Sequence, residues 1–306
     1  MGHNERMRRI RIGLVAAAAL AGCASPPPSP PPARPLERPA PALTASPSVA
    51  PAFPVPGACE RMVFLARQEW ALFGSPEVLP PGGTPPAAGA PSGTAAAVGG
   101  TDGRLVFPDP ASPTHELHAP MLSRVLVYWY SVTRAPIVGP SGELRPWSAA
   151  FVSWLARAAG LGGDEFPATA LHWDYIERFL RPRPTDAFET RDAAGTPPRI
   201  GDLVCQAREG TVELAQRTGF VPLAALRRGA YHCDVVVASR PGELQTIGGN
   251  VSDVVALARV PIDTAGRLLP DLRRPWAAVV ARRGTSPVSA CASLPPIPER
   301  AAGPAP

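Results

Sequence analysis

The spacing of apolar side chains predicts helices in the first half of this chain and strands in the second half. Near-helical spacing marks four segments: 59–73, 121–131, 147–159 and 170–180. The third is the clearest, because Phe151, Val152 and Leu155 form one stripe between Pro146 and Gly160, residues typical of a helix start and stop. From residue 199 onward, runs rich in Val and Ile predict strands at 201–207, 232–239, 244–248, 254–262 and 276–281.

Helices that precede strands in this way are typical of an α+β fold. We expect the helices to pack on an antiparallel sheet, because short hairpins can join consecutive antiparallel strands. The segment 209–230 interrupts the strands and is predicted to be a longer, partly helical excursion.

The N-terminal segment has the layout of a secretory signal peptide. Four Arg residues within 6–11 precede an apolar run over 12–21 that is too short to span a bilayer as a helix. The run ends in Leu-Ala-Gly before Cys23, which resembles the lipobox of bacterial lipoproteins. This resemblance implies removal of residues 1–22 and lipid attachment at Cys23. By the same resemblance to lipoproteins of two-membrane bacteria, Ala24 in place of Asp favours sorting to the outer membrane, with the domain facing the periplasm. The alternative is a plain secretory peptide with an incidental cysteine.

Composition divides the remaining chain into an ordered domain and its flanks. Pro, Ala and Ser dominate residues 23–56, which predicts an extended tether. The α+β domain is expected over 57–285, with a disordered insertion at 75–104, where Gly, Pro, Ala and Thr show no periodicity. The tail at 286–306 is again rich in Pro and Ala.

The net charge of +5 comes from Arg alone, because the chain contains no Lys. A mildly basic surface would suit an anionic envelope polymer, although a GC-rich coding sequence explains the same Arg and Ala content. No nucleic-acid partner is predicted.

The cysteine count predicts disulfides. Once Cys23 is lipidated, four cysteines remain, an even number in a compartment where disulfides persist. Cys205 and Cys233 lie in two predicted strands that can be neighbours, which leaves Cys59 and Cys291 near the ends of the domain. We therefore favour the pairs Cys205–Cys233 and Cys59–Cys291. Four cysteines allow three connectivities, and buried free thiols are the remaining alternative.

Four short segments carry a resemblance to a known family: 146–154, 201–205, 232–237 and 247–251. Together they resemble the DUF2272 family of bacterial proteins, across residues 59–282. That family is in turn similar to the CHAP and NlpC/P60 cysteine peptidases and amidases, which cut peptidoglycan peptides with a papain-like fold. The resemblance implies this fold, with a nucleophile opening a helix, a His beginning a strand and a polar residue on the next strand. Ser148, His232 and Asn250 occupy these three places.

A nucleophile at a helix N-terminus has a physical advantage, because exposed backbone N–H groups there can stabilise an oxyanion. His232 is then the predicted base, and Asn250 is predicted to hold the far nitrogen of its ring. Two departures from the family pattern bear on this site. Ser148 replaces the usual Cys, and Gly248 stands where CHAP domains often carry Glu. A serine depends more than a cysteine on a well-placed base.

Two functions from different classes therefore stay open. One is a hydrolase of amide bonds in peptidoglycan peptides that uses Ser148, His232 and Asn250. The other is a catalytically inactive lipoprotein that binds peptidoglycan or a protein partner through the same cleft. An enzyme that acts on another amide or ester is a third possibility, and Ser148 also has a purely structural use as a hydroxyl at a helix start.

Other residues are secondary candidates for the site. Asp234 shares a face with His232 if the strand is regular, so it is a second candidate to orient the imidazole. Asp253 could act in the same way from the following turn. Trp147 and His172 are predicted to contact substrate, although a helix surface beside a buried aromatic explains His172 equally well.

The segment 115–118 places two His and one Glu close together before a helix. It does not match the HExxH pattern, and Pro113 and Pro120 bracket it as a loop. Neither a metal site nor a cofactor is predicted.

Overall fold

The computed structural model describes residues 57–79, 104–109, 114–215 and 217–284, together with Cys291 and Ile297. The predicted signal peptide, the predicted lipidation site Cys23 and the predicted tether lie outside these residues, as do the interior of the predicted insertion and most of the tail. Among the described helices, none has the length and apolar character needed to cross a membrane.

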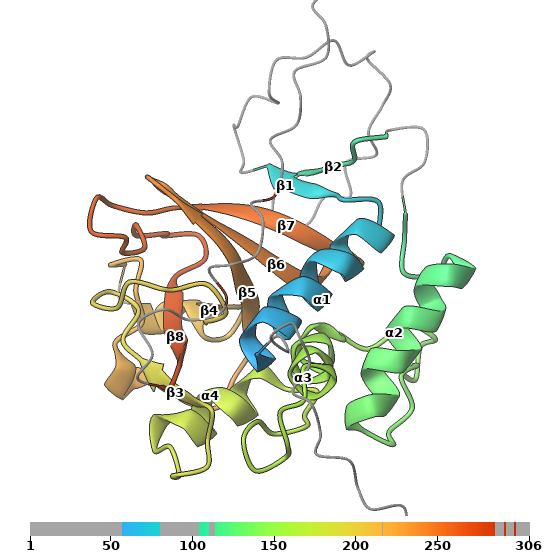
Figure 1. Cartoon of the computed structure of the whole chain (residues 1–306), viewed down its shortest axis with the longest axis horizontal. Helices are drawn as coiled ribbons and strands as arrows, with labels where there is room; N and C mark the ends of the chain where they lie inside the picture. The colour runs from blue at the N-terminus through green and yellow to red at the C-terminus, as the bar shows by residue number, and fades with distance from the viewer. Residues whose placement is uncertain are drawn as a thin grey trace, which may run out of the picture. The chain divides into compact units, whose positions relative to one another are not determined.

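Four α-helices form where the apolar stripes predict them. Each buries apolar side chains against the sheet or another helix, and α3 is buried along most of its length. Their bounds are α1 Ala58–Leu72, α2 Ala119–Val132, α3 Ser148–Ala158 and α4 His172–Leu180 (Figure 1).

The strands form a single eight-stranded sheet in the order β2-β1-β7-β6-β5-β4-β8-β3. The five predicted strands are confirmed as β4 Leu203–Ala207, β5 Tyr231–Arg240, β6 Glu243–Val251, β7 Val254–Pro261 and β8 Trp276–Arg282. Three further strands were not predicted: β1 Glu77–Leu79, β2 Arg104–Val106 and β3 Phe188–Arg191.

The sheet is mostly antiparallel but mixed. β1 pairs with β7 in parallel, with Glu77 opposite Leu257, and β2 then extends the edge antiparallel to β1. The expectation of a wholly antiparallel sheet is corrected at this edge. The same two short strands occupy both ends of the expected insertion, so the chain leaves the sheet only after Leu79 and returns at Arg104.

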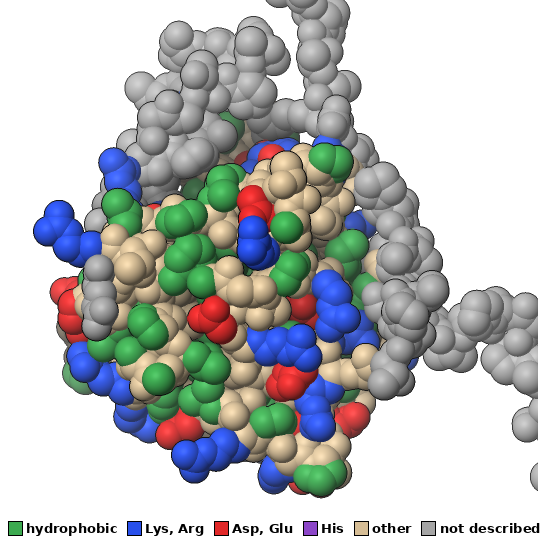
Figure 2. All heavy atoms as spheres, turned by 90° about the vertical axis from the view of Figure 1, so that its left-hand side faces the viewer, with side chains coloured by type: hydrophobic (Ala, Val, Ile, Leu, Met, Phe, Trp, Pro, Cys, Tyr) green, Lys and Arg blue, Asp and Glu red, His purple; other side chains and the backbone are tan. Residues whose placement is uncertain are grey.

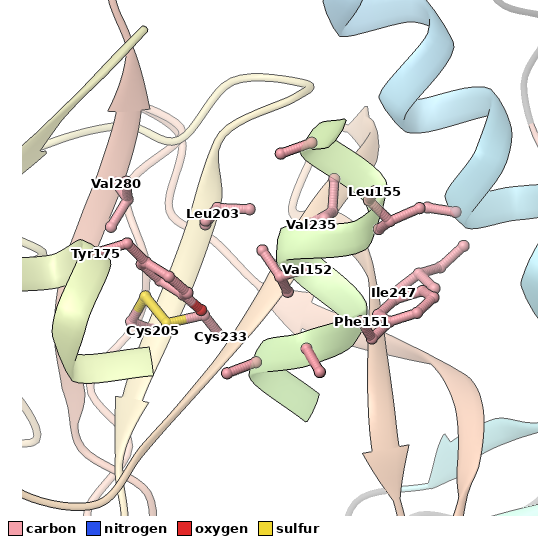
Figure 3. Packing of buried hydrophobic residues seen from close by; sticks show 14 of the residues in the cluster. Phe151, Val152, Leu155, Tyr175, Leu203, Cys205, Cys233, Val235, Ile247 and Val280 are labelled. Atoms are coloured by element: carbon pink, nitrogen blue, oxygen red, sulfur yellow. A yellow bond between two sulfur atoms is a disulfide. The ribbon is translucent and has the colours of Figure 1, made fainter. Parts of the chain in front are cut away.

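Helices α1, α3 and α4 cover one face of the sheet, and α2 packs on α3 (Figure 1). Figure 3 shows α3 crossing the strands, with Phe151, Val152 and Leu155 among the buried side chains between helix and sheet. On the opposite face a smaller apolar cluster forms around Trp276, against which Phe220 packs from the predicted excursion. The excursion contains two short 3₁₀ helices, Val212–Ala215 and Leu223–Ala225.

Both favoured disulfides are present. Cys205 and Cys233 face each other across β4 and β5, with a Cα–Cα distance of 4.1 Å, and their bond lies beside Tyr175 in Figure 3. Cys59 at the start of α1 is bonded to Cys291, with a Cα–Cα distance of 5.7 Å. The second bond ties the C-terminal segment to the first helix.

Arginine side chains in the described part of the chain are often paired with carboxylates. Arg178 contacts the fully buried carboxylate of Asp186, and Arg259 lies between Glu77 and Glu243. On the face that Figure 2 shows, basic and acidic side chains are intermingled. Much of the positive charge is therefore neutralised locally.

Candidate active site

Ser148 is the first residue of α3, the helix that crosses the sheet. Trp147 before it has non-helical dihedrals, φ −107° and ψ 7°, and its carbonyl oxygen accepts a 2.9 Å hydrogen bond from the Phe151 N–H. The first N–H groups of an α-helix have no acceptor within the helix. The Ser148 hydroxyl therefore lies at the positive end of the helix dipole, beside donors that could stabilise a negative oxygen.

The hydrogen bond of the Ser148 hydroxyl joins it to His172, not to the predicted His232. Ser148 Oγ and His172 Nε2 lie 2.7 Å apart, and the other ring nitrogen of His172 is hydrogen-bonded to the Tyr175 hydroxyl. His172 begins α4, and Tyr175 follows one helical turn later on the same side. Ser148, His172 and Tyr175 are 8 %, 6 % and 0 % exposed, so the three groups form a buried chain.

Burial determines the charge of His172 and Tyr175. Desolvation lowers the pKa of His172 well below its ordinary value, and the electrostatic interactions with His232 and Arg208 act in the same direction. Desolvation likewise raises the pKa of Tyr175, with a smaller contribution from Asp234. Both groups are therefore neutral at pH 7. A neutral imidazole has one donor and one acceptor nitrogen, so His172 can accept the Ser148 proton only when Nε2 carries no hydrogen.

The depressed pKa of His172 predicts a pH-dependent stability. Below pH 6.5 the unfolded chain protonates this imidazole while the folded chain does not, so stability falls as the pH drops. The loss attributable to this one group approaches about 1.4 kcal/mol per pH unit. Denaturant unfolding at several pH values between 5 and 7.5 measures it. The variant His172→Gln lacks the group, so its stability should fall less over the same range, and equal slopes in the two proteins would contradict the assignment.

His232 lies directly beyond His172. The two rings are 5.4 Å apart between centroids, and His232 Nε2 is 2.8 Å from Asp234 Oδ1. This contact is not a hydrogen bond, and neither atom has a hydrogen-bonding partner in the described part of the chain. The contact is therefore electrostatic, and it strengthens when the imidazole is protonated. It places the secondary candidate Asp234 beside His232.

Gly248 explains how the Asp234 carboxylate fits there. A Cβ atom at Gly248 would lie 1.8 Å from Asp234 Oδ1 and 3.0 Å from His232 Nε2. The absent side chain leaves the space that the carboxylate occupies. The carboxylate beside His232 thus comes from Asp234 on the same strand, β5, rather than from position 248 on the neighbouring strand β6.

Asn250 does not reach His232 with a hydrogen bond in this structure. The pairing of β6 with β7 shifts register between Gly248 and Val251, and Asn250 lies in this bulge with φ +56°. A bulge breaks the alternation of side chains along a strand. Regular alternation from Gly248 would have turned Asn250 toward the same face as His232.

The turn after this bulge joins the site to the segment before α2. Ser252 and Asp253 both have positive φ, as a two-residue type I′ hairpin requires. Asp253 Oδ2 lies 3.5 Å from His115 Nε2, so this secondary candidate contacts His115 and not His232. Among the described residues, no group of His, Cys, Asp and Glu is arranged to hold a metal ion.

Trp147, predicted to contact substrate, is instead fully buried. Its ring packs against Phe73, Tyr128 and Phe151, and its indole N–H donates a 2.6 Å hydrogen bond to Glu116 Oε2. The structure gives it a packing role directly behind Ser148.

Tyr175 is the site residue that sequence reasoning missed. Its three-residue spacing from His172 within the predicted helix at 170–180 places both residues on one side of that helix. This spacing indicates a role for Tyr175 only in combination with the contact between Ser148 and His172, which the sequence does not show.

Residues 131–282 match the family described as "Uncharacterized protein conserved in bacteria (DUF2272)". No match was found among curated proteins, and none among solved structures. The matched span runs from the end of α2 to the end of β8 and contains Ser148, His172, Tyr175, His232 and Asp234. The chain therefore carries a domain of the uncharacterized bacterial family DUF2272 across residues 131–282.

Proposed function

We propose that this domain is a serine hydrolase that cleaves amide bonds in the peptide part of peptidoglycan. The observation that carries the proposal is the 2.7 Å contact between Ser148 Oγ and His172 Nε2 at the N-terminus of α3. Nucleophile, neutral imidazole and unpaired helix N–H groups meet at one point, which is the arrangement that acyl transfer to a hydroxyl requires. The resemblance to CHAP and NlpC/P60 enzymes supports the substrate class and a papain-like arrangement of the helices and sheet.

In the first step, Ser148 Oγ attacks the carbonyl carbon of the scissile amide while its proton passes to His172 Nε2. The resulting oxyanion is stabilised by the first N–H groups of α3. The carbon–nitrogen bond then breaks, and His172 returns the proton to the leaving amine, which leaves an acyl ester on Ser148. Water then attacks this ester while His172 Nε2 takes a proton from the water. The bond between the acyl carbon and Ser148 Oγ breaks, and His172 passes that proton to Ser148 Oγ, which releases the product with a free carboxyl group.

Tyr175 and the pair of His232 and Asp234 act on His172 from its other sides. The Tyr175 hydroxyl holds the far ring nitrogen, which sets the orientation of the imidazole. His232 brings a second imidazole to the site, and Asp234 beside it can stabilise a positive charge there. In this mechanism His172 is the immediate base, whereas the sequence alone favoured His232.

The setting we propose is the bacterial envelope. The predicted signal peptide and the lipobox resemblance at Cys23 support a lipid-anchored protein, with the domain held in the periplasm by its Pro-rich tether. Peptidoglycan would lie within reach of such a tether.

One observation favours a second function, in which the domain binds a wall peptide without cleaving it. The neutral hydroxyl of Tyr175 is fully buried, and it is hydrogen-bonded to Nδ1 of His172. If Tyr175 donates to that nitrogen, the ring hydrogen of His172 moves to Nε2 and Ser148 becomes an acceptor. In that tautomer His172 cannot take the Ser148 proton.

Incubation of the purified full chain with peptidoglycan, followed by mass spectrometry of the released fragments, separates these functions. The expected result is release of peptides with one newly formed carboxyl end, together with covalent labelling of Ser148 by a fluorophosphonate. Ser148→Ala should abolish both signals, whereas Ser123→Ala, which changes an exposed hydroxyl on α2, should keep both. Binding of folded wild-type protein to peptidoglycan without release or labelling would overturn the hydrolase proposal in favour of the binding function.

A further inference from the structure

Glu116 is a buried carboxylate that the proposed reaction steps do not use. It is 8 % exposed, although it lies in the segment before α2 and not within a helix or strand. Its Oε2 accepts a 2.6 Å hydrogen bond from the Trp147 indole N–H. Desolvation raises the pKa of Glu116, while the hydrogen bond from the indole opposes this effect.

This hydrogen bond reaches Trp147, the N-cap residue of α3. Trp147 directly precedes Ser148, and its carbonyl oxygen accepts the first hydrogen bond of the helix, from the Phe151 N–H. A rotation of the Trp147 side chain that shifts the Trp147 backbone also shifts the peptide bond between Trp147 and Ser148.

The remaining surface of the Trp147 ring is held by packing alone. Phe73 and Tyr128 lie against it, and a Cβ atom added to Gly249 would come within 2.7 Å of the ring. These contacts confine the ring, and the hydrogen bond to Glu116 fixes the direction in which the indole N–H points. Glu116 supplies the directional contact.

A contribution to stability alone does not explain why a buried carboxylate stands at position 116. Burial of a charged group is costly, and an apolar side chain of similar size would often serve a core as well or better. The one described hydrogen bond of Glu116 goes to the side chain next to the nucleophile.

We infer that Glu116 is a positioning residue for Ser148, which acts by fixing the orientation of the Trp147 indole. The inference rests on the proposed function, in which the Ser148 hydroxyl must stay within proton-transfer distance of His172. A displacement of about 1 Å at such a site can lower turnover about a hundredfold.

The test compares Glu116→Ala, Glu116→Gln and the control Glu143→Ala in the full chain. Glu143 is an exposed carboxylate whose partner is Ser141, so its loss reports the general effect of removing a negative charge. We expect Glu116→Ala to lower kcat for fragment release about 10- to 100-fold with little change in KM, as misplacement of a catalytic group predicts. Glu116→Gln keeps an oxygen acceptor for the indole and should restore most of the rate. Unchanged kcat in folded Glu116→Ala would overturn the inference.

A second measurement separates this inference from the proposed function. In the Ser148→Cys variant, the alkylation rate of the residue 148 thiol by iodoacetamide, followed on its own peptide by mass spectrometry, reports the local geometry without any substrate. Addition of Glu116→Ala should change this rate and its pH profile, and addition of Glu143→Ala should not. If wild-type protein releases no fragments but the alkylation result holds, the hydrolase proposal fails while the positioning role stands. Equal alkylation profiles with and without Glu116 would refute the positioning role itself.

Discussion

Ser148→Ala, His172→Ala and the double variant are expected to lose hydrolysis to the same level, about a thousandfold or more below the wild type. The reason is that the two groups act as one unit. Without His172 the serine hydroxyl keeps its proton, and without Ser148 the imidazole has no nucleophile to activate. The losses should therefore not add. Initial rates of fragment release from peptidoglycan, measured for all three variants, test this expectation.

The variant His232→Ala tests which of the two histidines is the base. His232→Ala should lower the rate by a smaller factor, because His232 lies beyond His172 and its close contact is with Asp234. If His232→Ala abolishes release while His172→Ala leaves it nearly unchanged, His232 is the base, as the sequence suggested. In that case the Ser148–His172 bond would belong to a resting state.

Loss of the Cys59–Cys291 disulfide is expected to lower the free energy of unfolding by about 4 kcal/mol. The bond closes a loop of 232 residues, and longer loops restrict the unfolded chain more strongly. It also holds Cys291, which is 1 % exposed, against the start of α1. Alanine is the suitable replacement at both positions, because a buried serine hydroxyl would add a separate cost.

Denaturant unfolding of the oxidised protein and of the Cys59→Ala/Cys291→Ala variant measures this difference. The pair Cys205–Cys233 offers a matched comparison, since its loop is only 28 residues long and its removal should cost less. The expectation fails if both double variants lose the same stability, or if the Cys59–Cys291 variant is as stable as the wild type.

The regular parts of the fold were predictable because their signals are local. The stripe of Phe151, Val152 and Leu155 has the period of a helix, and the runs that became β5 and β7 are rich in β-branched residues. The short strands β1 and β2 carry three residues each, in or beside a segment dominated by Gly, Pro and Ala. Three residues are too few to show a period. β1 forms because it pairs with the edge of β7, and β2 forms because it pairs with β1.

The candidate site, too, was predictable from the sequence only in part. A hydroxyl at the start of a helix, a His at the start of a strand and an acidic residue two positions later could all be placed from the sequence. The partner of Ser148 could not, because His172 comes from a separate helix whose angle against α3 depends on packing. The role expected of Asn250 depended on regular alternation along β6, and a bulge at that point changed it.

The sequence by itself predicted the four helices and five of the eight strands in their order, favoured the two disulfide pairs that the structure contains, and supplied the residue types from which a hydrolytic site can be built. Periodicity and helix-start chemistry are properties of neighbouring residues, and the number of cysteines is a property of composition, so all three can be read without a fold. Only the tertiary structure decided that Ser148 contacts His172, that Asp234 occupies the space left by Gly248, and that Trp147 is buried behind the nucleophile. These outcomes depend on how helices and strands distant in sequence pack together, and the depressed pKa of His172 follows chiefly from the burial that this packing produces.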